Sequence, residues 1–525
     1  MKPLVYQLLV RSWGDNPDGI GKFRDVDDAS LKYFRRLGVT HLWLTGIPRH
    51  ATGYGPHPSP AAWVKGDAGS PYAVTDWFDT NPYLADNPQR RMEEFRDLAG
   101  RVHDAGMKVI TDFVPNHVAR DYGRFFPAPL SGGLDALGHP VLGACDDTSV
   151  HWKPENDFYY YPGQPLRLPG NTDYEEFPAR ASGNCFSPEP GINDWYDTIR
   201  LNYCDFHSPT WDKMLQVLLF WLEAGVDGFR CDMVEMVPWQ FFKWAIAEVK
   251  KCYPQCLFIA EVYNKDLYSK YLNDVGFDWL YDKSGMYDTL RGITESGLGK
   301  GGAFSTRQIT SCWQQAGQMQ PRLLNFLENH DEQRLASDFF AGSPWNGMAA
   351  LYVSSLFNTA PFMLYSGQEV GERGMGSEGF SGKDGRSSIF DFAIAPSVRR
   401  LWREIHGMPS GLSSEEKAVL DAYRLVTGLF YGSKAISDGL TYDLMWCNEG
   451  RPGFDPDRHF AFLRSCGQDV RLFTVNFSDR DADIPVVIPG HARDFMSIIS
   501  DVLGDDPGNP VTVRVPAHGA GMTIL

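Results

Sequence analysis

Basic residues and long apolar runs are both scarce in this sequence. Its 525 residues carry 49 Lys and Arg against 66 Asp and Glu, which gives a formal net charge of −17. Such a charge repels nucleic acid and anionic membrane surfaces and favours a neutral or cationic ligand, so no nucleic acid partner is expected. Because no stretch reaches the roughly 18 consecutive apolar residues of a membrane-spanning helix, no membrane contact is expected either.

Cysteine patterns that hold metals or crosslinks are also missing. The nine cysteines form no Cys-x-x-Cys pair. Several of them, such as Cys231 and Cys256, fall in apolar runs, so mostly free thiols are expected. A disulfide or a metal pair between Cys252 and Cys256 is the alternative.

The start of the chain carries no recognisable targeting segment. It lacks the charged start, apolar core and small-residue cleavage site of an export signal and leads directly into the apolar run 4–10. As written, the sequence predicts a cytoplasmic protein. Export with a signal already removed is the alternative.

Short apolar runs alternate with amphipathic segments from residue 4 to about residue 432. The runs predict strands at 4–10, 40–45, 108–112, 224–232, 257–261, 275–280, 322–328 and 361–365. The clearest amphipathic segments predict helices at 27–37, 87–105, 209–223, 237–251 and 413–429. This alternation is typical of an α/β fold with a parallel barrel.

Two regions depart from the alternation. Residues 118–208 are rich in Pro, Gly, Asn and Tyr and contain no predicted long helix. Because about 90 residues are too many for an ordinary loop, they are predicted to form an inserted domain. From about residue 433, alternating runs such as 470–477 and 511–515 predict an antiparallel β-sandwich. The length and the 43% of hydrophobic residues suit two or three domains.

Acidic side chains stand at the ends of four predicted strands. Arg230 and Asp232 lie two residues apart at one strand end, which places them on the same face. Glu261 ends the next strand, and Asp112 and Asp331 follow two others. An isolated Arg230–Asp232 ion pair would suit a purely structural role. Four acid-tipped strands instead favour a functional site at the carboxyl ends of the sheet.

Four short segments in this order resemble the α-amylase superfamily of glycoside hydrolases (glycoside hydrolase family 13). They are Asp-Phe-Val-Pro-Asn-His at 112–117, Gly-Phe-Arg-Cys-Asp at 228–232, Glu261, and Asn-His-Asp at 329–331. The resemblance spans roughly residues 4–525. It implies a (β/α)8 TIM barrel with a loop-rich domain inserted after strand 3 and a C-terminal antiparallel β-sandwich domain. The expected domains are a catalytic barrel at 1–117 and 209–432, the inserted domain at 118–208 and the C-terminal domain at 433–525.

The resemblance implies an α-amylase-type glycosidase. Such an enzyme cleaves α-1,4-glucosidic bonds of starch-type glucans or maltooligosaccharides with retention, through a covalent glycosyl-enzyme intermediate. Asp232 is then the nucleophile, Glu261 the general acid and base, and Asp331 a third carboxylate that stabilises the transition state. The substrate is a neutral α-glucan, which suits the negative net charge.

The resemblance also implies the residues that hold the sugar. Tyr72, in the long loop 48–81, is expected under the ring whose bond is cut. His117 and His330 are expected to donate hydrogen bonds to hydroxyl groups, and Arg230 to keep Asp232 ionised. Asp112 is expected to orient Arg230 or its loop, or to contact the sugar. For Tyr72 and each histidine, an ordinary structural role is the alternative.

Two positions differ from many starch-cutting members of this superfamily. Glu235 and Met236 stand where those members carry Lys-His, which leaves the sites for the leaving part of the substrate open. The segment 201–205 lacks the usual calcium-binding Asp, so Asn116 remains a plausible ligand without an expected partner. No cofactor is expected to be required, and calcium is the alternative.

Other functions on the same barrel stay open. One is an α-glucan transglycosylase or a disaccharide-acting member of the family. Another is a non-catalytic sugar-binding protein, which would lack the nucleophile or the acid, whereas Asp232 and Glu261 are both present here. The oligomeric state is not predicted.

Overall fold

Eight parallel strands form the central sheet of the computed structural model, which describes residues 1–55, 58–124, 126–127, 131–170, 172, 174–379, 381–496 and 510–525. They are β1 (Leu4–Leu9), β2 (His41–Thr45), β5 (Lys108–Phe113), β10 (Gly228–Cys231), β11 (Leu257–Ala260), β12 (Trp279–Tyr281), β13 (Leu323–Leu324) and β14 (Phe362–Tyr365). The strands pair in the order β13-β12-β11-β10-β5-β2-β1-β14. A parallel bridge between Asn325 and Phe362 joins the two ends. The expected (β/α)8 barrel is thereby confirmed.

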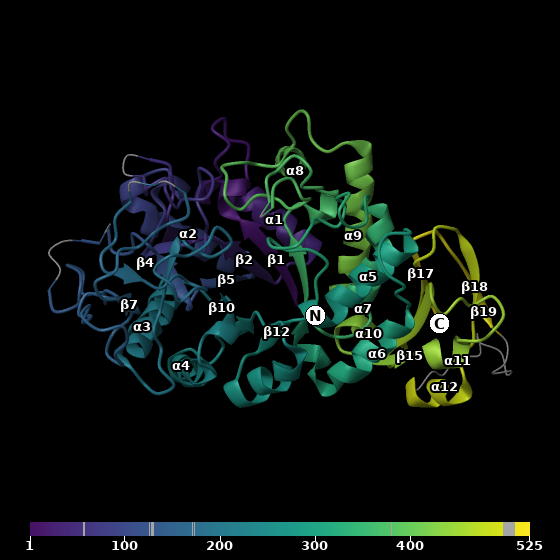
Figure 1. Ribbon diagram of the computed structural model, residues 1–525. Helices are drawn as coiled ribbons and strands as arrows, with labels where there is room; N and C mark the ends of the chain where they lie inside the picture. The colour runs from purple at the N-terminus through teal and green to yellow at the C-terminus, as the bar shows by residue number, and fades with distance from the viewer. Residues whose placement is uncertain are drawn as a thin grey trace.

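Helices connect these strands and cover the outside of the barrel (Figure 1). They are α1 (Asp28–Leu37), α2 (Arg91–Asp104), α3 (Pro209–Glu223), α4 (Trp239–Cys252), α5 (Asp288–Gly297), α6 (Arg307–Ala316), α7 (Met348–Leu356), α8 (Pro396–Ile405) and α9 (Ser414–Gly432). The predicted helices correspond to α1, α2, α3, α4 and α9. Helix α2 begins later than predicted because Pro88–Arg90 form a separate 3-10 turn.

Two predicted strands are shorter in the structure. Residues Lys270–Val275 form a π-helical turn, so β12 begins only at Trp279. Val275 is buried there, and a short apolar run fits a buried helical turn as well as a strand. In the predicted strand 322–328, only Leu323 and Leu324 form β13. Beyond them, the Glu328 carboxylate accepts a hydrogen bond from Arg334 at 2.8 Å.

The barrel interior is filled by side chains from alternate positions of its strands. The cluster consists of Val5, Trp43, Ile110, Ile259, Tyr281, Tyr287, Leu324, Phe326 and Met363. A larger apolar cluster packs between the sheet and its helices. The barrel is therefore a packed core and its strand ends are a rigid platform.

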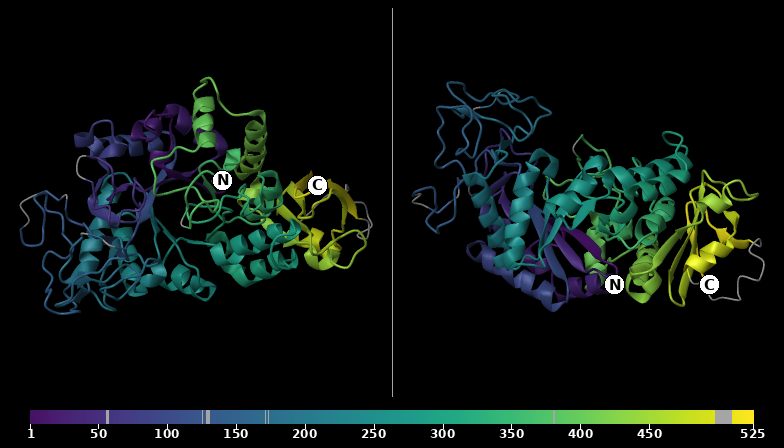
Figure 2. Two further views of the ribbon diagram at one scale, coloured as in Figure 1. Left: turned by 45° about the horizontal axis from the view of Figure 1, so that its top comes forward. Right: turned by 90° about the horizontal axis from the view of Figure 1, so that it is seen from below.

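The region after β5 consists of short strands and loops in its described part. Strand β6 (His117–Ala119) pairs with β9 (Thr198–Arg200), and β7 (Tyr160–Tyr161) pairs with β8 (Ala179–Arg180). A second addition to the barrel is the antiparallel pair of β3 (Pro48–His50) and β4 (Val74–Thr80). The region 118–208 lies at one end of the molecule, and the C-terminal sheet lies at the other (Figure 2).

The C-terminal residues form the predicted antiparallel β structure. Strands β15 (Leu440–Asp443), β16 (His459–Cys466), β17 (Asp469–Asn476) and β20 (Ala520–Ile524) make one sheet, and β18 (Ala482–Val486) pairs with β19 (Val511–Val515). Short helices α10 (Lys434–Ser437), α11 (Met445–Asn448) and α12 (Gly490–Met496) lie beside them. Phe357, directly after α7, packs against Phe460 and Phe462 with ring centroids 5.2 and 5.1 Å apart. This contact attaches the sheet to the barrel.

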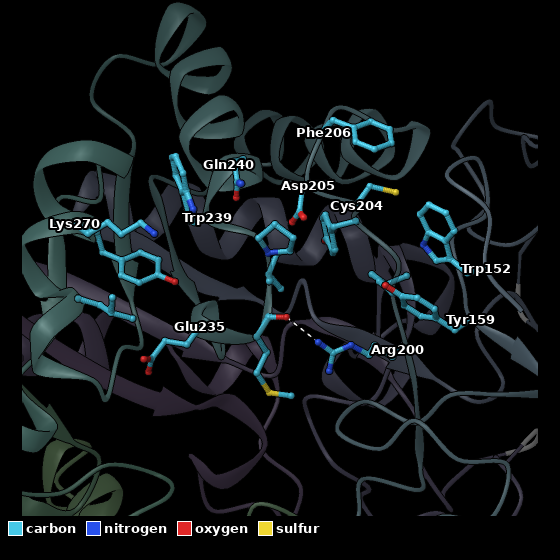
Figure 3. A pocket seen from close by; sticks show the side chains of 17 residues that line it. Trp152, Tyr159, Arg200, Cys204, Asp205, Phe206, Glu235, Trp239, Gln240 and Lys270 are labelled. Atoms are coloured by element: carbon cyan, nitrogen blue, oxygen red, sulfur yellow. Dashed lines mark hydrogen bonds between the residues drawn. The ribbon is translucent and has the colours of Figure 1, made fainter.

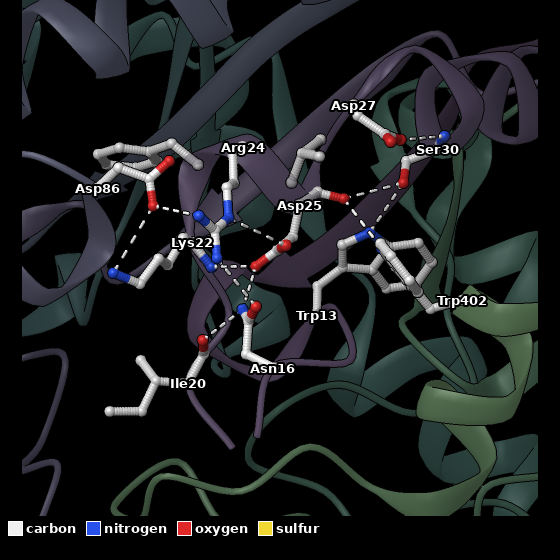
Figure 4. A network of polar contacts seen from close by, with 12 residues as sticks. Trp13, Asn16, Ile20, Lys22, Arg24, Asp25, Asp27, Ser30, Asp86 and Trp402 are labelled. Carbon is white, nitrogen blue, oxygen red and sulfur yellow. Dashed lines mark hydrogen bonds and ion pairs between the residues drawn. The ribbon is translucent and has the colours of Figure 1, made fainter. Parts of the chain in front are cut away.

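A partly buried polar network fixes the entry into α1 (Figure 4). The Asp25 carboxylate accepts hydrogen bonds from the Asn16 side chain at 2.5 Å and the Lys22 amide at 2.8 Å. Its backbone carbonyl accepts from the Ser30 hydroxyl and from the Trp402 indole of α8. The network thereby links the first loop of the barrel to a helix near its end.

Two global features complete the fold. All nine cysteines are free, so Cys252 and Cys256 form no disulfide. Within the described residues, no helix has both the length and the apolar character needed to cross a membrane.

Candidate active site

Arg230 stands at the centre of the acidic strand ends. Its side chain is fully buried, and its two terminal nitrogens form ion pairs with Asp232 at 2.5 Å, Glu261 at 2.9 Å and Asp112 at 3.5 Å. The strand register explains the cluster, because Arg230 on β10 lies beside Asp112 on β5. Asp232 and Glu261 each extend the hydrogen-bonded ladder by one residue beyond their strands. Asp232 is 7% and Glu261 2% exposed.

The guanidinium of Arg230 also rests on aromatic rings. Its central carbon lies 5.6 Å from the Trp43 ring centroid, 5.6 Å from that of Tyr281 and 5.4 Å from that of Tyr72. These cation–π contacts stabilise a charge that no water reaches. The floor of the site is therefore continuous with the barrel core.

The protonation states of Asp232 and Glu261 depend on each other. Burial raises the pKa of both carboxyl groups, and the Arg230 charge opposes this rise. The negative charge of Asp232 raises the pKa of Glu261 further, whereas a hydrogen bond from Glu261 lowers that of Asp232. The environments therefore place the proton on Glu261 and the charge on Asp232.

Two contacts that the sequence prediction missed orient Glu261. The Tyr263 hydroxyl donates to one carboxylate oxygen at 2.7 Å, and the Met233 amide donates to the other at 2.8 Å. Met233 has a left-handed φ of 45°, a strained value for a residue with a side chain. This turn directly after Asp232 aims the amide at Glu261. Tyr263 lies only two residues beyond Glu261 in the sequence. This short spacing is the one signal from which the contact could have been predicted.

Asp331 lies at the open side of the acidic cluster. Burial raises the pKa of its carboxyl group to about 8, and the charges of Glu261 and Asp232 add to the rise while Arg230 opposes it. His330 Nε2 lies 3.3 Å from one of its oxygens.

His330 and Tyr72 form a stacked pair beside the acids. Their ring centroids are 5.2 Å apart, and the Tyr72 hydroxyl lies 2.5 Å from His330 Nε2. Gln7 on β1 donates its amide to His330 Nδ1 at 2.7 Å, which assigns the ring proton to Nε2. Burial and the Arg230 charge hold the His330 pKa well below its ordinary value, so the ring stays neutral. Asp112 accepts from Tyr72 at 3.4 Å and from Trp43 at 3.1 Å.

His117 is also neutral and buried. Burial lowers its pKa to about 4. Asn116, predicted as a possible calcium ligand, directs its side-chain nitrogen at His117 Nδ1 and at the Gly183 carbonyl. Asn202, from the altered segment, is engaged with Trp152, Lys153 and Asn156. Across the described ranges, no group of three or more His, Cys, Asp or Glu side chains could hold a metal.

Most of these side chains line one cavity of about 240 Å³. Of the predicted residues, Asp232, Glu261, Asp331, Tyr72, His117 and His330 line it, and Arg230 and Asp112 lie beneath. Side chains that the sequence prediction did not include complete the lining: Lys65, Ser70, Trp195, Asp197, Thr198, Met233, Tyr263, Ile389 and Phe390. Most of these residues belong to loops. Loops have no regular apolar periodicity, so the sequence does not predict which of their side chains reach the cavity.

The fold and this cluster define a (β/α)8 barrel with a carboxylate site at the carboxyl ends of its strands. The model of the alpha-amylase catalytic domain matches residues 7–395. The chain belongs to the alpha-amylase family.

Its relatives and structural neighbours are distant in sequence. Alpha-amylase 3 of Dictyoglomus thermophilum is 22% identical over 456 residues, which are 83% of this chain and 78% of the relative. A 4-alpha-glucanotransferase of Thermotoga maritima is 25% identical over 390 residues, 70% of this chain and 72% of the relative. Several others match over only 33% to 37% of their own length.

A solved structure agrees with the fold over the whole chain. The maltogenic alpha-amylase AmyB of Thermotoga neapolitana superimposes with a TM-score of 0.59 at 19% identity. The match covers 100% of this chain and 96% of that one. At this identity the likeness concerns the fold alone.

Proposed function

We propose that the protein hydrolyses α-1,4-glucosidic bonds of starch-type glucans or maltooligosaccharides with retention of configuration. The observation that carries this proposal is the pair of carboxyl groups, Asp232 and Glu261, held by one guanidinium at neighbouring strand ends. Neighbouring strands lie about 4.8 Å apart, and retaining glycosidases separate their two carboxyl groups by roughly 5 to 5.5 Å. The cavity around them carries hydrogen-bonding groups for one neutral sugar ring.

Each residue of the site has a role in the proposed mechanism. Asp232 attacks the anomeric carbon while Glu261 gives its proton to the leaving oxygen, so the glycosidic bond breaks and a glycosyl ester forms. Glu261, now a carboxylate, takes a proton from water, and that water displaces Asp232 from the sugar. Arg230 keeps Asp232 ionised, and Asp331 and the neutral histidines bind hydroxyl groups.

Glycosyl transfer is the second candidate. In this reaction a sugar hydroxyl, instead of water, attacks the ester on Asp232. The support for it is the similarity to a 4-alpha-glucanotransferase, because both reactions use the same pair of carboxyl groups. A sugar-binding protein without catalysis is less well supported, since the residues proposed as nucleophile and acid, Asp232 and Glu261, are both present.

The experiment is incubation with maltotriose through maltoheptaose, with chromatography of the products. Hydrolysis predicts only shorter sugars, whereas products longer than the substrate would mean transfer. NMR of the first-formed product tests retention. A β-anomer would exclude Asp232 as a covalent nucleophile.

The cytoplasmic location expected from the sequence remains a proposal. Nine free thiols are compatible with a reducing compartment, where disulfides rarely persist. Cell fractionation of the native source with an antibody to the protein is the test, and recovery in the culture medium would contradict it.

A further inference from the structure

Two loops are joined into a wall along one side of the active-site cavity. One is the segment between β3 and β4, and the other is the segment 387–392 after β14. The Ala68 amide donates to the Phe390 carbonyl at 2.9 Å, and the Phe392 amide donates to Asp67 at 3.1 Å. Behind them, Arg11 donates to the carbonyls of Gly69 and Ile389.

The two loops leave no gap between them at Gly66. This residue has a left-handed φ of +62°, and a Cβ atom there would lie 2.3 Å from the Phe390 carbonyl oxygen. Only glycine permits so close an approach of two backbones. Next to it, Lys65 forms an ion pair of 3.4 Å with Asp197, which belongs to the region 118–208. Three separate parts of the chain therefore form one continuous wall.

A wider groove, drawn in Figure 3, lies next to the cavity on the side of Tyr263, whose amide donates to the groove residue Glu235 at 2.7 Å. This groove has a volume of about 740 Å³. The two spaces share the strand β9, on which Thr198 lines the cavity and Arg200 the groove. Arg200 donates to the Met236 carbonyl at 2.9 Å and so fixes the groove floor.

Aromatic side chains line this groove. Trp152 is 46% and Phe206 56% exposed, and both are labelled along its edge in Figure 3. Trp239 carries the Lys270 ammonium 4.5 Å from its ring. Exposed aromatic faces are suited to stacking on sugar rings. Glu235 also lines the groove, but its carboxylate accepts hydrogen bonds from the backbone amides of Tyr263 and Asn264.

We infer that the cavity holds a single sugar ring, the non-reducing end of the glucan, and that the rest of the chain lies in the groove. Hydrolysis breaks the bond between C1 of the ring on Asp232 and O4 of the next ring, which leaves with the proton of Glu261. The wall beyond the first ring then requires that ring's own O4 to be a free hydroxyl. This inference rests on the proposed function and narrows it to cleavage from chain ends.

The test compares two aryl maltoheptaosides, one with a free non-reducing end and one with O4 and O6 of that end joined in an acetal. The free substrate should lose glucose units one at a time, and the blocked one should be cleaved at least 100-fold more slowly. Equal cleavage of both would overturn the inference and leave hydrolysis standing. Cleavage of neither, together with no action on maltotriose, would overturn the proposed function as well.

A variant of the groove gives an independent readout. Trp239→Ala should raise KM for maltoheptaose about three- to tenfold, the range expected for one lost stacking contact. The rise should be smaller for maltose, whose second ring alone enters the groove. Trp446→Ala removes a tryptophan of α11 that lies outside the groove and is 52% exposed, and it serves as the control. An equal KM for both variants would show that the chain does not lie in this groove.

Discussion

A single arginine holds three carboxyl groups at the ends of three neighbouring strands. Arg230 therefore links the protonation states of Asp112, Asp232 and Glu261, so a change of charge at one carboxyl group shifts the pKa of the other two. The residue-scale predictions concern the two that we propose for catalysis.

Asp232→Asn should abolish turnover without unfolding the protein. The amide keeps the shape of the side chain but cannot form the glycosyl ester, so kcat should fall by roughly 10⁴-fold or more. Steady-state kinetics on maltoheptaose and thermal melting are the measurements. Asp338→Asn, an exposed carboxylate paired with Arg373, is the control and should keep full activity. Substantial turnover by Asp232→Asn would assign the nucleophile elsewhere.

Glu261→Gln should discriminate between leaving groups. The variant cannot protonate the departing oxygen, so activity on maltooligosaccharides should drop severely. An aryl glycoside with an acidic phenol departs without a proton and should be affected less in the glycosylation step. Pre-steady-state release of the phenol measures that step. Equal losses on both substrates would argue against the acid role.

Tyr263→Phe should shift the pH profile to higher values. The Tyr263 hydroxyl donates to the carboxylate of Glu261, which stabilises the ionised form and lowers the pKa of that group. Its removal therefore raises the Glu261 pKa. Because the acid must be protonated, kcat/KM falls as pH rises through this pKa, and the alkaline limb should move upward. If the alkaline limb, measured over pH 5 to 10, did not move, Tyr263 would not influence the pKa of the catalytic acid.

At the scale of elements, the acid-tipped strand ends were predictable because a short apolar run followed by an acid is a local pattern. Asp232 and Glu261 could be named from that pattern and from the family resemblance. The contacts of Lys65 with Asp197, and of Ala68 with Phe390, join loops that are far apart in the chain. Such contacts depend on where the fold brings the loops, and no local periodicity encodes them.

Ser30→Ala should weaken the entry into α1. The Ser30 hydroxyl is buried, accepts from the Trp13 indole at 3.1 Å and donates to the Asp25 carbonyl at 3.0 Å. Its loss leaves a buried indole N–H without an acceptor, which costs roughly 1–3 kcal/mol. Urea unfolding should register this loss. Ser414→Ala, an exposed serine in the first turn of α9, is the control and should change stability little.

At the scale of the whole molecule, the barrel and its additions were largely predictable. The parallel barrel and the antiparallel C-terminal structure follow from the change of pattern near residue 433. The start of β12 was not predictable, because an apolar residue such as Val275 can be buried in a helical turn as well as in a strand. Sequence patterns thus identify layers more reliably than the ends of short strands.

Removal of metal ions should leave the protein intact. Asn116 is the one ligand that the family resemblance suggests, and within the described residues no group of three or more His, Cys, Asp or Glu side chains could hold a metal ion. We therefore expect EDTA to change neither activity nor the melting temperature. Loss of activity in EDTA, restored by added calcium, would contradict this expectation.

The opposite placement of the region 118–208 and the C-terminal sheet gives the molecule a natural point of attachment (Figure 2). Trp195 and Asp197, which border the cavity, belong to the end that lies away from the C-terminus. A tether fused after Leu525 would therefore fix the protein to a bead or fibre by its far end. The residues by which the region 118–208 borders the cavity would then lie at the end away from the support.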